Sequence, residues 1–161
     1  MSIITPYIDN LTKLQKEIPS KAREIITENS SYILQMIMYE QLALGMDYKG
    51  NMIKHPKGNG TYAQSTQDVY AKSSPRPIKP KVVGKRYNME WTGEFFNGLG
   101  IKVEDDGFNI FSINGKKELL EGIYNTKLTI FTKEHNKFIN ETILLPNLYK
   151  HLTRNLLRVK R

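Results

Sequence analysis

Apolar residues recur every three or four positions from residue 20 to residue 44, which is the spacing that gathers them on one face of an α-helix. Pro19-Ser20 offers a helix start, with Glu24 close to the capping-box position, and Gly45 is a typical residue just beyond a helix end. We predict a helix over this stretch, roughly 37 Å long, preceded by a shorter helical segment at Ile8 to Glu17. The second half of the long helix is apolar nearly all round, so we expect the rest of the domain or a neighbouring subunit to cover it on more than one side.

A different period follows near the middle of the chain. Leu99, Ile101 and Val103 alternate with Gly100 and charged residues, which predicts a half-buried strand. Asp105-Asp106-Gly107 is a turn signal, and residues 108–113 form the expected return strand of a hairpin.

The C-terminal third is predicted to be mainly helical. A turn at Asn114-Gly115 precedes a short helical piece at 116–121, and residues 128–131 fit either a short strand or a connector. The last helix is expected to start at Thr132, and Pro146 lies inside its apolar stripe, where it predicts a kink or a break.

Residues 47–86 show neither the helical nor the strand period, and they hold four of the eleven Gly and four of the seven Pro. A stretch of this length without regular structure is generally functional, or ordered only on meeting a partner. The fold class expected is therefore α+β in a single domain, residues 1–161: a long N-terminal helix, an extended irregular arm at 47–86, a small antiparallel sheet with a hairpin, and a C-terminal helix.

The end of the arm is basic. Residues 72–86 hold six Lys and Arg and no acid, and its prolines favour an extended, polyproline-like conformation. One interpretation is phosphate binding, with Tyr70 and Tyr87 as flanking aromatics for base stacking. The other is an arm that lies on an acidic neighbour in an assembly, and we favour it because no nucleic-acid-binding motif accompanies the arm. The basic C-terminal helix fits an anionic partner, although cations there also complement the helix dipole.

The composition of the chain favours some classes of protein function and excludes others. The chain of 161 residues has a formal net charge of +8, which favours anionic partners, and it has no cysteine, which excludes disulfide scaffolds and thiolate chemistry. The N-terminus does not resemble a signal peptide, and no apolar run is long enough to span a bilayer. We expect a protein made in a reducing cytoplasm, or carried in a particle assembled there.

Catalytic motifs are not evident. His55, His135 and His151 are too far apart in sequence for a typical zinc spacing, and three consecutive acids, residues 104–106, sit at a turn where they are expected to be solvated. Residues 57–61 lack the spacing of a phosphate loop, and neither a nucleophile elbow nor a dinucleotide fingerprint occurs. A hydrolase such as a cell-wall lysin fits the size and charge, but it needs two converging carboxylates, and no persuasive pair is found. The chain is predicted not to be an enzyme and to need no cofactor or metal.

One order of features resembles a known family. A helix ending at 44–50, a loop with Thr61-Tyr62, a basic stretch ending at Tyr87, the segment 91–99 (Trp-Thr-Gly-Glu-Phe-Phe-Asn-Gly-Leu) and a hairpin follow one another. This order resembles the tail-completion and minor-tail proteins of tailed bacteriophages, which are small α+β virion-morphogenesis proteins of the neck or tail. Thr92-Gly93 followed by an aromatic is the firmest point of the resemblance, while Trp91 directly before it departs from the usual pattern.

The resemblance implies a virion structural protein at the head–tail interface or tail. Its partners would be other virion proteins (portal, connector or tail subunits) and further copies of itself in a ring, with possible contact to DNA and none to a membrane. The alternative is a nucleic-acid-binding module that uses the basic arm and the basic C-terminal helix. The residues expected to carry the interactions are Trp91, Phe95 and Phe96 in the body, and Arg76, Lys79, Lys81, Lys85 and Arg86 in the arm.

Overall fold

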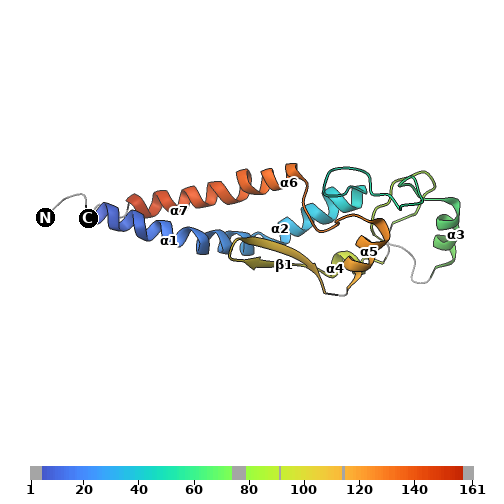
Figure 1. Ribbon diagram of the computed structural model, residues 1–161, viewed down its shortest axis with the longest axis horizontal. Helices are drawn as coiled ribbons and strands as arrows, with labels where there is room; N and C mark the ends of the chain where they lie inside the picture. Colours follow the sequence, from blue (N-terminus) through green and yellow to red (C-terminus); the bar gives the residue numbers. More distant parts are fainter. Residues whose placement is uncertain (1–4, 74–78, 91, 114, 158–161) are drawn as a thin grey trace.

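A computed structural model of the chain describes residues 5–73, 79–90, 92–113 and 115–157. The molecule is elongated, with a pair of long helices at one end and the irregular middle of the chain at the other (Figure 1). The elements confirm the expected α+β class, with a long N-terminal helix, a hairpin and a C-terminal helix.

The N-terminal helical segment starts earlier than predicted. Helix α1 runs from Thr5 to Glu28 and contains Pro19, so the predicted helix start at this proline was wrong. Pro19 is exposed, so the carbonyl group that it leaves unbonded faces solvent. Leu14 on one side of it and Ile25 on the other are both buried, and packing on both sides keeps the two halves in one helix.

The same segment continues to the predicted end. Helix α2 (Ser30–Gln35) is followed by a π-helical turn, η1 (Met36–Gln41), and a 3₁₀ turn, η2 (Leu42–Leu44). Gly45 then takes a left-handed conformation with φ of +69°, which stops the helix. Its position is also crowded, because a Cβ there would collide with the carbonyl oxygen of Tyr87.

The C-terminal helix starts as predicted and does not break. Thr132 is the N-cap, and its hydroxyl oxygen accepts a hydrogen bond from His135 N at 3.2 Å. Helix α6 (Lys133–Phe138), a π-helical turn η3 (Ile139–Leu144) and α7 (Leu145–Leu157) follow in one continuous run. The wider π turn lies directly before Pro146, and such turns relieve the clash of a proline ring with the preceding turn.

The predicted hairpin is present. Strands β1 (Leu99–Glu104) and β2 (Gly107–Ser112) pair antiparallel, with Ile101 opposite Ile110 and a two-residue turn at Asp105-Asp106. One face of the hairpin packs on the core beside α1 and α2. Residues 128–131 form a connector rather than a strand, with Leu128 and Phe131 buried.

The middle of the chain is more ordered than its composition suggests. It contains helix α3 (Gln64–Lys72), which has no buried residue and therefore no apolar stripe to reveal it in the sequence. Two isolated bridges, Met46 with Met52 and Thr61 with Arg86, tie the middle into loops, and Ile53 anchors it in the core. The short helices α4 (Glu94–Asn97) and α5 (Lys116–Tyr124) flank the hairpin.

The core lies where α1, the α2–η2 segment, the hairpin and the α6–η3 segment meet. It is formed by the following buried side chains: Ile25, Ile26, Ile33, Met36, Ile37, Leu42, Ile53, Phe95, Phe96, Leu99, Ile110, Leu128, Phe131, Ile139 and Ile143. No helix in the described parts of the chain is long and apolar enough to cross a membrane.

Candidate interaction surfaces

Lys81 is not available to another molecule, although it was predicted to be a contact residue of the arm. Its side chain is only 2% exposed, and its ammonium group donates hydrogen bonds to Asn88 Oδ1 and to the carbonyl oxygen of Glu90. The ammonium nitrogen also lies 5.3 Å from the centre of the Tyr62 ring. The prediction of Lys81 as a contact residue is therefore corrected: it fixes the base of the arm to the body.

Lys79 is bound within the same cluster. Its ammonium nitrogen lies 2.7 Å from Glu90 Oε2, and Glu90 is buried. Burial lowers the pKa of Lys81 to about 8, and Lys79 adds to the lowering, while the charge of Glu90 raises it in part. Burial also raises the pKa of Tyr62 to about 12. Lys79 thus pairs with the carboxylate of Glu90, while Lys81 is held by the Asn88 side chain and the Glu90 carbonyl oxygen.

Lys85 and Arg86 remain exposed, as an interaction role requires. The backbone beside them is held by hydrogen bonds from Tyr62 N to Lys85 O (2.9 Å) and from Tyr87 N to Gly60 O (3.3 Å). Arg76 and Trp91, two further predicted contact residues, lie outside the described residues.

Phe95 and Phe96, two further candidate contact residues, are buried in the core, so they anchor the body and do not face a partner. Gly93 precedes them as the N-cap of α4 in a left-handed conformation, with φ of +81°, which favours glycine at this position. The Phe96 ring packs edge-on against Tyr39 at a centroid distance of 6.0 Å. The aromatic segment therefore joins the hairpin to the N-terminal helical segment.

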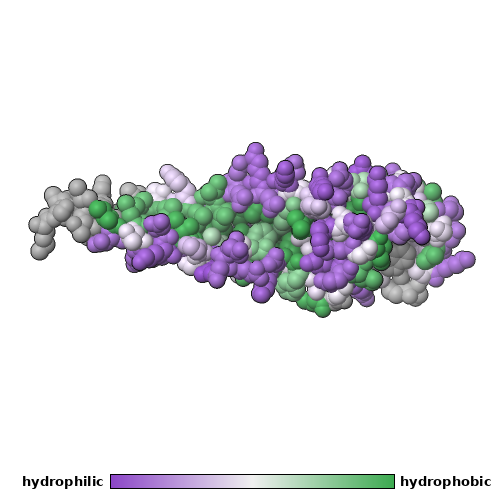
Figure 2. Space-filling model, in the orientation of Figure 1, coloured by the Kyte–Doolittle hydropathy of each residue, from purple (hydrophilic) through white to green (hydrophobic). Residues whose placement is uncertain are grey.

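The pair of long helices, α1 and α7, forms a stalk with an apolar groove of about 370 Å³. Side chains from both helices line it: Ile8, Leu11, Thr12, Leu14, Gln15, Ile18, Leu152 and Leu156. Ile8 is 55% exposed and Leu11 52% exposed. Figure 2 shows this apolar stripe running along the stalk. Sequence periodicity placed apolar residues on these helices, but it did not indicate that part of the stripe lacks cover.

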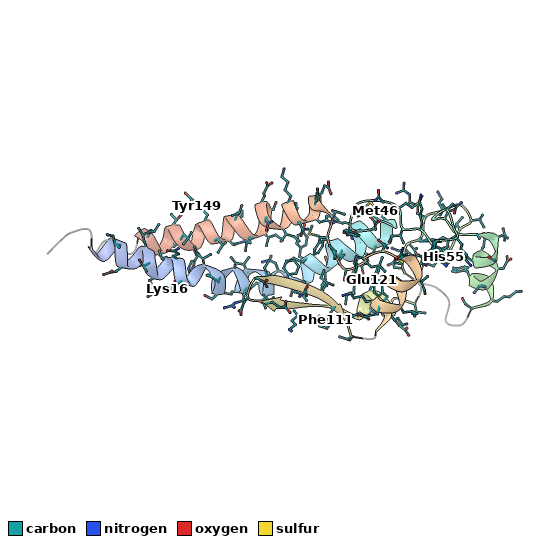
Figure 3. All side chains as sticks on the ribbon, viewed as in Figure 1. Lys16, Met46, His55, Phe111, Glu121 and Tyr149 are labelled. Atoms are coloured by element: carbon teal, nitrogen blue, oxygen red, sulfur yellow. The ribbon has the colours of Figure 1, made fainter. Side chains whose placement is uncertain are left out.

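The stalk carries further exposed apolar side chains on α7. Leu145 and Tyr149 are more than half exposed, and Figure 3 shows Tyr149 and Lys16 projecting from opposite sides of the stalk. The two helices are also joined by polar contacts, since His151 Nε2 lies 3.7 Å from Glu17 Oε2 and Asn10 donates to the Asn155 carbonyl oxygen at 3.4 Å. The stalk is thus an antiparallel helix pair joined by polar contacts, and part of its apolar surface is exposed.

A second hollow, of about 500 Å³, lies between the arm and helices α4 and α5. Tyr62, Tyr87 and Tyr124 contribute to its wall, with the Tyr87 ring centre 5.1 Å from that of Tyr62 and 5.6 Å from that of Tyr124. Burial raises the pKa of Tyr124. Because these rings hold one another, Tyr87 is not free to stack on a base, as one interpretation of the sequence required.

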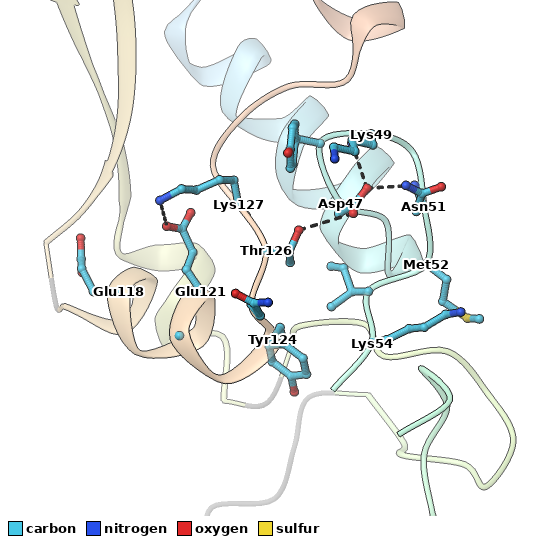
Figure 4. Close-up of a pocket in the computed structure, with 14 residues that line it drawn as sticks. Asp47, Lys49, Asn51, Met52, Lys54, Glu118, Glu121, Tyr124, Thr126 and Lys127 are labelled. Atoms are coloured by element: carbon cyan, nitrogen blue, oxygen red, sulfur yellow. Dashed lines mark hydrogen bonds and ion pairs between the residues drawn. The ribbon is translucent and has the colours of Figure 1, made fainter. Parts of the chain in front are cut away.

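The third hollow is polar and measures about 760 Å³ (Figure 4). Asp47 accepts hydrogen bonds from Lys49 N at 2.8 Å and Asn51 N at 2.9 Å, and Thr126 Oγ1 lies 3.4 Å from its other oxygen. Glu121 accepts one from Leu128 N at 2.9 Å and pairs with Lys127 at 3.3 Å. Both carboxylates are therefore engaged in shaping the surrounding loops.

The two basic regions of the sequence lie far apart. The last turns of α7 belong to the free end of the stalk, whereas α3 and the arm lie at the opposite end of the molecule (Figure 1). The alternative function that joined the basic arm and the basic C-terminal helix in one nucleic-acid surface is therefore not supported by this arrangement.

The three histidines are likewise separate. His135 Nδ1 lies 3.3 Å from Gln41 Oε1, His151 contacts Glu17, and His55 is exposed in the arm. Among the described residues no group of three or more His, Asp or Glu is placed to hold a metal ion. Comparison of the chain with protein-family models found no matching family, and comparisons with curated proteins and with solved structures found no significant match.

Proposed function

We propose that the protein is a structural subunit of a tailed-phage virion, at the head–tail interface or in the tail, which assembles with copies of itself into a ring and has no catalytic activity. The order of helix, basic stretch, Thr92-Gly93 segment and hairpin supports this assignment through its resemblance to tail-completion and minor-tail proteins. The α+β body, with long helices at both ends of the chain, is compatible with that resemblance.

One observation carries the proposal: the stalk groove is apolar and open. Two helices packed side by side share one seam only, so apolar residues beyond that seam stay in water unless another molecule covers them. Burying the exposed half of a Leu or Ile side chain contributes roughly 1 kcal/mol. Several such contributions per subunit interface would come from the exposed apolar side chains of the stalk, which are Ile8, Leu11, Leu145, Tyr149 and Leu156.

A ring follows if the stalk binds a different surface of the next copy. Such head-to-tail contacts repeat with a constant rotation, and they close when the rotation divides a full turn. A weak contact of this kind gains strength because every subunit makes it twice.

The test compares two pairs of substitutions by mass photometry and native mass spectrometry over a range of protein concentrations. Ile8→Gln with Leu11→Gln makes the groove polar, while the control, Lys13→Gln with Lys16→Gln, changes exposed positions of α1 that do not line the groove. Glutamine is a good helix former, so the helix itself is preserved in both.

We expect the unmodified chain and the control to form a closed oligomer of defined mass, and the groove variant to be a monomer with an unchanged circular dichroism spectrum. A chain that stays monomeric at all concentrations, or a groove variant that assembles as well as the control, would contradict assembly through the stalk.

A further inference from the structure

Two segments of the arm lie side by side at the end of the molecule opposite the stalk. Hydrogen bonds join Tyr62 N to Lys85 O (2.9 Å), Gly84 N to Tyr62 O (3.0 Å) and Tyr87 N to Gly60 O (3.3 Å). The loop at residues 52–54 lies close to the first segment, since a Cβ built on Gly60 would come within 3.1 Å of Lys54 Cγ. The pairing fixes the backbone of both segments.

Four exposed cations lie on or just before these paired segments, and we name them the basic ladder: Lys85 and Arg86 belong to the second segment, and Lys54 and Lys57 to the loop that leads into the first. Within the described parts of the chain none of the four forms an ion pair. The nearby acids are engaged elsewhere, since Glu90 pairs with Lys79 and Asp47 accepts from backbone amides. The ladder therefore holds positive charge that the fold does not neutralise.

The wider region has the same character. Residues 47–90 contain nine Lys and Arg against three Asp and Glu, which is most of the excess positive charge of the chain. Uncompensated cations that repel one another lower the stability of a fold, so their concentration at one end indicates an anionic partner.

The chemistry of the ladder favours the backbone of a nucleic acid duplex. Three of the four cations are lysines, which act as mobile point charges, whereas buried protein–protein ion pairs favour the planar fork of arginine. A duplex carries about one negative charge per 1.7 Å of its axis, so a ladder meets several phosphates in any register. Single strands bind through exposed aromatic rings, and here Tyr62 and Tyr87 are packed on each other.

We propose that the basic ladder binds the phosphate backbone of double-stranded DNA without reading its sequence. This inference goes beyond the proposed assembly role, and it uses neither the stalk nor the buried lysine of the arm. A ladder subunit repeated around a ring would place one such contact on every copy.

The experiment measures fluorescence anisotropy of two unrelated 20-base-pair duplexes with the full chain, from 50 to 200 mM salt. The test variant replaces all four ladder residues by Gln. The control replaces Lys13, Lys16, Lys150 and Arg154 of the stalk by Gln, which removes the same charge from exposed positions at the other end. Circular dichroism checks that both variants are folded, and mass photometry follows assembly in the same samples.

We expect the unmodified chain to bind both duplexes equally and to lose about 100-fold in affinity across this salt range, as three to four phosphate contacts require. The ladder variant should lose at least tenfold in affinity at 50 mM salt and show a flatter salt dependence, while the stalk control should stay within about threefold. Equal losses in the two variants would overturn the proposal, because the effect would then be one of net charge.

Two other outcomes would also overturn it: undetectable duplex binding at 50 mM salt, or ladder-dependent binding to polyglutamate or to anionic phospholipid vesicles that is stronger than binding to DNA. Assembly and duplex binding are measured independently, because mass photometry reports assembly and the groove variant Ile8→Gln with Leu11→Gln keeps the ladder. Duplex binding by that monomeric variant would support the ladder even where the ring proposal failed.

Discussion

The side chain of Gln41 joins the end of the N-terminal helical segment to the N-cap of the C-terminal one. Its Oε1 atom accepts a hydrogen bond from the backbone N–H of Thr132 at 3.3 Å, and its Nε2 atom donates to the carbonyl oxygen of Ile130 at 2.9 Å. Gln41 is fully buried, so this amide replaces water for two backbone groups that the connector would otherwise leave unpaired.

Replacing Gln41 by Leu should therefore lower the free energy of unfolding by about 2–4 kcal/mol, because one buried and one partly buried backbone group lose their partner. Urea denaturation followed by circular dichroism measures the change. Gln35→Leu is the matched control, since Gln35 is exposed on the same helical segment, and it should change stability by less than about 0.5 kcal/mol. Equal effects of the two substitutions would show that the buried amide contributes little.

Gly45 is predicted to tolerate no side chain. Gly45→Ala strains a left-handed backbone and also drives a Cβ into the carbonyl oxygen of Tyr87. Gly50 has a similar φ, +77°, but nothing within 4 Å of a Cβ. We expect Gly50→Ala to cost about 1 kcal/mol of unfolding free energy and Gly45→Ala at least twice as much. If thermal and urea denaturation gave the same loss for both, the close approach of residue 87 would be refuted.

The buried Lys81 should make stability depend on pH. Its folded pKa, about 8, is lower than the ordinary lysine pKa of 10.5, so between these values the unfolded chain binds more protons than the folded one. The free energy of unfolding should therefore rise from pH 8 to pH 10, on the order of 2 kcal/mol, and this rise should vanish in Lys81→Met. Above pH 10, ionisation of Tyr62 in the unfolded chain acts in the opposite direction.

The control for this pH profile is Lys85→Met, which removes an exposed lysine of the same arm. Its stability should follow the unmodified chain between pH 8 and pH 10. A parallel profile for Lys81→Met would mean that Lys81 keeps its ordinary pKa and is not desolvated.

Replacing Pro19 should raise the stability of the fold rather than lower it. It occupies an exposed position inside α1, where an alanine would restore a backbone hydrogen bond and remove the ring clash. We expect Pro19→Ala to raise the free energy of unfolding by about 1–3 kcal/mol, measured by urea denaturation. A loss of stability instead would indicate that the bend at this residue is needed for packing against α7.

Local signals predicted local structure well. The end of the long helix at Gly45, the hairpin turn at Asp105-Asp106 and the N-cap at Thr132 each depend on a few adjacent residues, and all three are present. Helix α3 could not be found this way, because it buries nothing and leaves no apolar period.

The candidate contacts were harder to predict, because exposure depends on the whole fold. Lys81 and Lys85 look alike in the sequence, yet Lys81 is buried beside Asn88 and Glu90 while Lys85 faces solvent. The open groove of the stalk likewise depends on how α1 meets α7, which periodicity within either helix does not specify.

The π-helical turn at Ile139–Leu144 bears on how this helix tolerates changes of length. Buried or part-buried apolar residues step by four from Ile139 to Ile143, by five to Leu148 and by four to Leu152. The wide turn accommodates one residue more than a regular α-helical turn. Lys150 lies in the regular part of α7, where no wide turn compensates for a change of length. Its deletion would rotate Leu152 and Leu156 by about 100° around the helix axis, away from α1.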